Sequence, residues 1–306
     1  MPGPNYHLLV LGDSVPWGQG LKEPEKHHSL VLDWIRRFHP DLSLSKEVMA
    51  HSGAVIGMNA PRGLPFVDGE VPNDFPSILD QVFRFTSDPA QIDLVLVNGG
   101  INDVGVDKIF NPLTRSSDLS IRIRQHCFVD LKLLLHELHA RIPGAHTRFL
   151  ISSYYPVLSN ESDALRIPIF CQLFGIGLAN FLFPRNPVAK VIANSLLFWN
   201  ESTRLISDAV DQVNVETGSN RFHLVKPAFE AVNAAFAPQP WVFGIKANTL
   251  PQDEIAAQRA LACIRDEDDL LQRELCFRAS AGHPNRWGSQ AYFNATFPIL
   301  QREFGL

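Results

Sequence analysis

The chain has 306 residues, enough for one α/β enzyme domain or two smaller domains. Hydrophobic residues make up 45% of it and charged residues 19%, a mixture that excludes a disordered chain and a bundle of membrane spans. The net charge of −5, from 27 Lys and Arg against 32 Asp and Glu, argues against nucleic acid as the main partner.

Short apolar runs alternate along the chain with segments of helical periodicity. The apolar runs predict five strands, at 6–11, 46–50, 92–98, 148–155 and 221–225. The periodic segments predict helices at about 30–38, 72–83, 119–141 and 200–216, and a last helix after His283. This β/α order implies a sheet of parallel strands with helices on both faces.

Two stretches do not fit this alternation, and we interpret them as insertions into a single domain spanning 1–306, at about 160–199 and 236–278. The first contains an uncharged run at 167–183 with four phenylalanines: Phe170, Phe174, Phe181 and Phe183. Its polar residues and glycines make it a poor bilayer span. It is either additional core or a lid or wall for an acyl chain beside Ser14. The second contains an acidic run at 266–269, which predicts a solvated helix face.

The cysteines and the N-terminus bear on the compartment. Of the four cysteines, only Cys263 and Cys276 are close enough in sequence to invite a local bridge, and the compartment decides whether it forms. The first six residues lack the basic and apolar regions of a secretory signal. We therefore expect a cytoplasmic protein, unless a signal has been trimmed, and no stable membrane span.

Polar residues follow three predicted strands and precede the last helix. Ser14, Gly53 and Asn102 come after the first, second and third strands, and His283 lies just before the final helix. The carboxyl ends of parallel strands meet at one edge of a sheet, where function collects. A nucleophilic hydroxyl needs a base, and a developing oxyanion needs hydrogen-bond donors. Ser14 and His283 could supply the nucleophile and the base, and Gly53 and Asn102 could supply amide donors.

Four sequence blocks around these residues resemble the conserved blocks of the SGNH, or GDSL-like, hydrolase family. They are Gly12-Asp13-Ser14-Val15-Pro16-Trp17-Gly18-Gln19-Gly20-Leu21, Ser52-Gly53-Ala54, Gly100-Ile101-Asn102-Asp103 and His283-Pro284-Asn285. The resemblance implies a three-layer α/β/α, flavodoxin-like fold with a five-stranded parallel sheet. It also implies hydrolysis of esters or thioesters without a metal or other cofactor, with Ser14 as nucleophile and His283 as base. The amides of Ser14 and Gly53 and the side chain of Asn102 would be the oxyanion donors.

One position departs from the family pattern. The family usually has Asp three residues before the histidine, where this chain has Ser280. The acid of a triad fixes the imidazole tautomer and stabilises the imidazolium, so another group has to replace it. The main-chain carbonyl or the hydroxyl of Ser280 could accept the Nδ1 proton of His283, and a distant carboxylate such as Glu274 is the alternative.

Each site residue also has a purely structural interpretation. Ser14 and His283 could cap or pack helices, Gly53 could serve a turn with positive φ, and Asn102 could tighten a loop. We expect Asp13 and Asp103 to hydrogen-bond loop amides rather than to transfer protons.

Other candidates are weaker. His136 and His139 lie on one helix without an evident third metal ligand, so we predict no metal site. The Gly175-Ile176-Gly177 segment lacks the preceding strand of a dinucleotide loop. The pairs His27-His28 and Arg36-Arg37 are interpreted as surface.

The sequence thus predicts a serine hydrolase that cleaves a carboxylic ester, with a small-molecule or lipid ester as its partner. Two alternatives stay open. One is a deacetylase of carbohydrate esters, and the other is a catalytically weak protein that keeps the fold and binds a lipid or a partner. The acyl chain, the alcohol and the oligomeric state are not given by the sequence.

Overall fold

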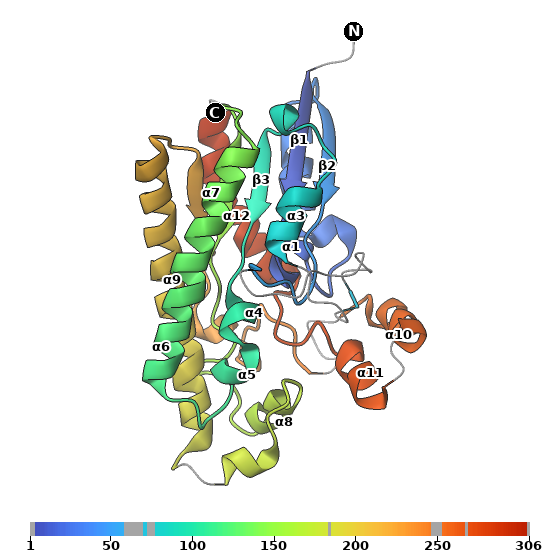
Figure 1. The fold of residues 1–306 in the computed structure, drawn as a ribbon. Coiled ribbons are helices and arrows are strands. Elements are labelled where there is room, and N and C mark those ends of the chain that lie inside the picture. The colour runs from blue at the N-terminus through green and yellow to red at the C-terminus, as the bar shows by residue number, and fades with distance from the viewer. Residues whose placement is uncertain are drawn as a thin grey trace.

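The core of the chain is a sheet of five parallel strands. The computed structural model describes residues 4–57, 70–71, 77–182, 185–245, 253–266 and 269–304. The strand order is β2-β1-β3-β4-β5, with every pairing parallel (Figure 1). The strands are β1 (Asn5–Val10), β2 (Ser43–Val48), β3 (Leu94–Val97), β4 (Arg148–Ser152) and β5 (Phe222–Val225). All five overlap the predicted runs, and β2 begins at Ser43, three residues before its predicted start.

The central strands are buried because helices cover both faces of the sheet. All four residues of β3 are buried, as expected for a parallel strand between two layers. The register pairs Leu8 with Leu94, and Leu94 with Arg148, so the strands end close together at one edge. The predicted three-layer α/β/α fold is confirmed.

The helices form the two outer layers. α2 packs against α12 on one face of the sheet. On the other face α7 lies between α3 and α9 and packs against both (Figure 1). The longer helices are α2 (His27–Phe38), α3 (Ile78–Arg84), α6 (Ser116–Arg124), α7 (Leu131–Arg141), α9 (Pro187–Thr217) and α12 (Arg286–Glu303). The remaining helices in the described ranges are α1 (Ser14–Trp17), α4 (Ile101–Val104), α5 (Val106–Ile109), α8 (Ile167–Gln172), α10 (Ala256–Asp266) and α11 (Leu270–Phe277). Short 3-10 turns are η1 (Glu23–Glu25), η2 (Pro89–Gln91), η4 (Leu178–Phe181) and η5 (Ala231–Asn233), and η3 (Gln125–Asp130) is a π-helical segment between α6 and α7.

Two helices differ from their predicted bounds. α9 begins at Pro187, 13 residues before the predicted start at 200, because Pro187 is at a first-turn position that needs no N–H donor. Residues 187–199, the last third of the predicted insertion at 160–199, therefore belong to this helix. The helix expected at 72–83 is described only from Ile78, and residues 72–76 lie outside the described ranges.

The prediction that His27 and His28 lie on the surface is wrong, whereas Arg36 and Arg37 are exposed as expected. Both histidines are buried at the start of α2, and the Nε2 atom of His27 lies 2.8 Å from the Thr296 hydroxyl oxygen on α12. Burial lowers the pKa of His27 to about 3, so this side chain is neutral at physiological pH. His27 therefore belongs to the contact between α2 and α12, whereas the Nδ1 atom of His28 lies 3.2 Å from Lys46 Nζ on β2.

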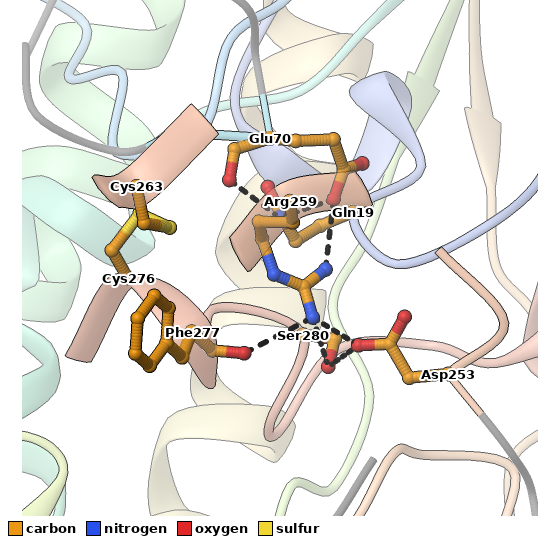
Figure 2. The surroundings of a disulfide bond; sticks show 8 residues. All are labelled: Gln19, Glu70, Asp253, Arg259, Cys263, Cys276, Phe277 and Ser280. Carbon is orange, nitrogen blue, oxygen red and sulfur yellow. Dashed lines mark hydrogen bonds and ion pairs between the residues drawn. A yellow bond between two sulfur atoms is a disulfide. The ribbon is translucent and has the colours of Figure 1, made fainter. Parts of the chain in front are cut away.

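The second predicted insertion contains the α10 and α11 helices, joined by a disulfide between Cys263 and Cys276 (Figure 2). The acidic run at 266–269 falls at the junction of the two helices instead of on one helix face, and residues 267–268 lie outside the described ranges. Among the described residues, no helix combines the length and apolar character needed to cross a bilayer.

Candidate active site

Ser14 lies directly after β1, at the first position of α1. The Asp13 side chain caps this helix by accepting a hydrogen bond from the Val15 N–H at 2.9 Å. The preceding turn is held by Gln81, whose side-chain oxygen accepts from the Gly12 N–H at 2.6 Å and whose side-chain nitrogen donates to the Gly12 carbonyl at 2.9 Å. These contacts fix the turn that presents the Ser14 hydroxyl at the carboxyl edge of the sheet.

His283 lies in the loop before α12, and its Nε2 atom is 2.7 Å from Ser14 Oγ. Asn285 caps α12 through hydrogen bonds from two N–H groups of its first turn. On the other side, the Phe243 N–H donates to the His283 carbonyl at 2.8 Å and the Gly282 N–H donates to the Phe243 carbonyl at 3.0 Å. The loop that carries His283 is therefore paired with residues 241–243 by main-chain hydrogen bonds.

The Nδ1 atom of His283 lies 3.3 Å from the main-chain carbonyl oxygen of Ser280. The Ser280 hydroxyl points elsewhere and donates to Asp253 Oδ2 at 2.5 Å. Glu274, the alternative in the sequence, instead pairs with Arg278 at 3.2 Å on the exposed face of α11. The acceptor at the position of the missing acid is therefore a carbonyl dipole rather than a carboxylate.

Burial lowers the pKa of His283 to about 4, although the hydrogen bond to the Ser280 carbonyl opposes the shift. The positive charge of Arg259 also lowers this pKa. The imidazole is thus neutral over most of the pH range in which proteins are stable, which is the protonation state that a general base requires.

Gly53 and Asn102 lie beside Ser14 and line the same cavity. Gly53 has a φ of 77°, a conformation that favours glycine. The Asn102 side chain donates one hydrogen bond, to the Ala54 carbonyl at 2.8 Å, and an amide nitrogen carries two N–H groups. The main-chain N–H groups of Ser14 and Gly53 donate to no other described residue. Three sets of donors are thus available at this edge of the sheet.

Asp13 and Asp103 accept hydrogen bonds from loop amides, as predicted. The Asp103 carboxylate accepts from the Ile56 N–H at 3.0 Å, which ties the Asn102 loop to the Gly53 turn. Asp13 is fully buried and also accepts from the Tyr154 hydroxyl at 2.8 Å. Burial raises the pKa of Asp13 to about 6, against the hydrogen bonds from Val15 and Tyr154, which lower it.

A cavity of about 280 Å³ opens at Ser14 and His283. Its walls are mostly apolar, and Arg278 is the charged residue among the lining residues in the described ranges. Phe174 and Leu173 from the first insertion line one side, together with Phe110. Phe170 is buried in the core and Phe181 packs against it, and Phe183 lies outside the described ranges. The apolar run at 167–183 thus contributes both core and cavity wall.

Several residues near the site were not singled out in the sequence. Tyr154, directly after β4, joins two site loops because its hydroxyl also accepts from the Ile101 N–H at 3.1 Å. Glu70, Asp253 and Arg259 form a buried group of charges behind Ser280 (Figure 2). The tyrosine could have been found from its place after a strand. Glu70 and Asp253 lie outside helices and strands, and Arg259 lies on α10, a helix that the sequence analysis did not predict.

The other sequence candidates lie elsewhere. His136 Nε2 contacts Glu216 at 2.7 Å, and His139 Nδ1 lies 2.7 Å from an Arg221 nitrogen. In the described ranges, no three His, Cys, Asp or Glu side chains are arranged to hold a metal ion.

Comparison with known proteins gives remote structural similarity. No protein-family model and no curated sequence matches the chain. Among solved structures, a phospholipase A1 from Streptomyces albidoflavus is 14% identical with a TM-score of 0.48, covering 98% of this chain and 99% of that one. A second match is a carbohydrate acetylesterase family member from Sinorhizobium meliloti, which is 14% identical with a TM-score of 0.44, covering 98% of this chain and 100% of that one. A third is an acetyl xylan esterase from Geobacillus stearothermophilus, which is 13% identical with a TM-score of 0.43, covering 100% of this chain and 97% of that one.

Proposed function

We propose that the chain is a serine hydrolase that cleaves carboxylic esters through an acyl-enzyme. The observation that carries the proposal is the 2.7 Å contact between His283 Nε2 and Ser14 Oγ at the mouth of a cavity. That distance is within the range for a nucleophile and its general base. The cavity provides space for the group that Ser14 attacks.

In the first half of the reaction, Ser14 Oγ attacks the carbonyl carbon of the ester while His283 Nε2 takes the Ser14 proton. The carbonyl oxygen becomes an oxyanion, for which the Ser14 and Gly53 amides and the Asn102 side chain are the donors. The imidazolium gives its proton to the alcohol oxygen as the C–O bond breaks. The alcohol leaves, and the acyl group stays on Ser14.

In the second half, His283 takes a proton from water, and the resulting hydroxide attacks the acyl carbon. The bond to Ser14 Oγ breaks, His283 returns the proton to that oxygen, and a carboxylic acid leaves. The Ser280 carbonyl holds Nδ1–H throughout, so that Nε2 is the nitrogen that carries the exchanged proton.

The cavity favours an acyl chain of several carbons over an acetyl group. Val157, Phe174 and Leu275 offer apolar walls beyond the Ser14 hydroxyl. Each methylene that leaves water for such a wall contributes about 0.8 kcal/mol. Four added methylenes would therefore improve transition-state binding by roughly 3 kcal/mol before ordering costs. This lining supports a lipid or medium-chain ester over a carbohydrate acetate.

The test is labelling with a fluorophosphonate probe, together with hydrolysis of p-nitrophenyl esters from acetyl to palmitoyl. The proposal expects covalent labelling of the parent chain and none of Ser14→Ala, with ester hydrolysis lost in the same variant. A parent chain that binds medium-chain fatty acids but is neither labelled nor hydrolytic would instead be a binding protein with a hydrolase fold.

A further inference from the structure

Three charged side chains, buried almost completely, meet behind the loop that carries His283. Arg259, on α10, is 2% exposed, and its Nη1 atom lies 3.0 Å from Glu70 Oε2. Its Nη2 atom contacts Asp253 Oδ2 (Figure 2). We call Glu70, Asp253 and Arg259 the ionic cluster. Buried ion pairs cost much desolvation free energy and seldom add net stability. The position of these pairs behind the His283 loop therefore indicates a role other than stabilising the fold.

On one side the ionic cluster holds residues 277–283, which we call the base turn. Arg259 Nη2 donates to the Phe277 carbonyl at 3.3 Å, and the Ser280 hydroxyl donates to Asp253 Oδ2 at 2.5 Å. Ser280 is also the residue whose carbonyl accepts from His283 Nδ1. The cluster therefore fixes both the start of the base turn and the residue that orients the imidazole.

On the other side the ionic cluster holds residues 14–20, which we call the nucleophile loop. Glu70 accepts hydrogen bonds from the Trp17 indole at 3.0 Å, the Gln19 side chain at 2.8 Å and the Gly20 N–H at 3.2 Å. Gln19 in turn accepts from the Ser52 hydroxyl, next to Gly53. One group of charges thus connects the segments that carry the nucleophile, an oxyanion donor and the base.

The nucleophile loop and the base turn also touch directly. A Cβ atom at Gly20, where φ is +83°, would lie 2.6 Å from the Ser280 Cβ. A shift of either segment would therefore move the other, and their relative position sets the distance between His283 and Ser14.

We propose that Arg259, held between Glu70 and Asp253, is a positioning residue for His283 that acts through the base turn and the nucleophile loop. None of the three cluster residues lines the cavity at Ser14, so they do not touch the substrate. The inference rests on the proposed function of Ser14 and His283. The planar fork of Arg259 satisfies two carboxylates and a carbonyl at once, which a lysine ammonium cannot do with the same geometry.

The ionic cluster also affects the charge state of the base. The charged or titratable groups around His283 are Arg259 from α10, Arg278 after α11 and Tyr155 after β4. Among these, Arg259 is the charge that lowers the pKa of His283. Loss of this cation raises that pKa, and the acid limb of the pH profile of kcat/KM then moves to higher pH.

The experiment compares Arg259→Lys and Arg259→Gln with the parent, each normalised to the number of Ser14 side chains that react with a fluorophosphonate. A displaced base can cost about 10²-fold in rate, so we expect kcat to fall by roughly 10- to 100-fold in both variants, with KM little changed. Only Arg259→Gln should move the acid limb, and the pKa of His283 measured by NMR should rise with it.

Arg221→Gln is the matched control, because Arg221 is also buried and holds the carbonyls of Ile142 and Gly144 at 2.9 and 2.6 Å, before β5. We expect Arg221→Gln to lower the midpoint temperature of thermal unfolding and to leave kcat per reactive serine unchanged. Glu70→Gln is a milder change of the ionic cluster, for the case that the Arg259 variants do not fold. It keeps the side-chain shape and should still lower kcat.

The inference is overturned if the folded Arg259 variants, or Glu70→Gln, keep the parental kcat per reactive serine and the parental acid limb. It is also overturned if the NMR pKa of His283 is the same in the parent and in Arg259→Gln. A parent that hydrolyses no ester contradicts the proposed function instead, and the NMR titration then still judges the effect of Arg259 on His283.

Discussion

The Nδ1 atom of His283 lies 3.3 Å from the main-chain carbonyl oxygen of Ser280, and no carboxylate in the described ranges hydrogen-bonds this nitrogen. A carbonyl fixes the imidazole tautomer but carries no full charge to stabilise an imidazolium. The low pKa of His283 follows from the same arrangement, since burial is opposed by dipoles alone.

We first predict that Ser280→Ala lowers kcat by no more than the Arg259 variants do, because the substitution preserves the carbonyl and removes only the hydroxyl bonded to Asp253. Glu274→Gln should leave kcat unchanged, since the Glu274 side chain is exposed and does not line the cavity. Steady-state kinetics of both variants check this. A loss near the 10⁴-fold that follows removal of a triad acid would show that the Ser280 hydroxyl, and not its carbonyl, orients the base.

The oxyanion assignment predicts that Asn102→Ala lowers kcat by about 10²- to 10³-fold, the usual cost of one lost donor. Gly53→Ala should lower it as well, by strain at a φ of 77°. Asn214→Ala is the control, because Asn214 bonds the main chain of Phe222 at the amino end of β5, opposite to the carboxyl edge that carries Ser14. That control should lose thermal stability only. Full activity in folded Asn102→Ala would remove this residue from the site.

The pH profile of kcat/KM should have an acid limb near pH 4, below the ordinary histidine value of 6.5. The base must be neutral, so activity falls as the pH drops through the pKa of His283 in the folded protein. Asp13→Asn separates this limb from the titration of Asp13 at about 6. An acid limb that stays in place in Asp13→Asn belongs to His283, whereas one that disappears belongs to Asp13.

Stability should change with pH in the same range. His27 and His283 have folded pKa values of about 3 and 4, both depressed. Their contribution is therefore fully present above pH 6.5 and is lost as the pH falls towards 4. Urea unfolding at pH 7 and pH 4.5 measures this loss, and acid-limb rates should be taken directly after a pH jump so that unfolding does not distort them.

Phe174→Ala should flatten the preference for longer acyl chains and spare acetyl ester hydrolysis, because Phe174 lines the cavity. Phe181→Ala is a control from the same insertion, since Phe181 packs against the core and does not line that cavity. The comparison is kcat/KM from acetyl to octanoyl esters. If both variants lost stability with the parental chain-length preference, the segment would be core only.

The fold and four site positions could be predicted from the sequence because both leave local signals. A strand that is buried on two faces appears in the sequence as an apolar run. A fixed place relative to a strand or helix is likewise visible for the four candidate residues, Ser14, Gly53, Asn102 and His283. The geometry that joins Ser14 to His283 spans 269 residues and had to come from the structure.

The ionic cluster could not be predicted for a physical reason. Glu70 and Arg259 are 189 residues apart, and the sequence around each of them is the same whether its charge is solvated or buried against the other. The burial of His27 was missed similarly, since it depends on Thr296 of a helix at the other end of the chain. Pairings of this kind are set by tertiary structure alone.

The disulfide between Cys263 and Cys276 has a consequence for where the chain works. Cys276 lines the cavity, and the bond joins the helix of Arg259 to the helix that leads into Ser280. Such bonds persist in oxidising compartments and are rare in the cytosol, so the cytoplasmic location expected from the N-terminus stays a prediction that this bond does not favour. The fraction of chains with a competent site would then depend on the thiol–disulfide redox potential of the compartment.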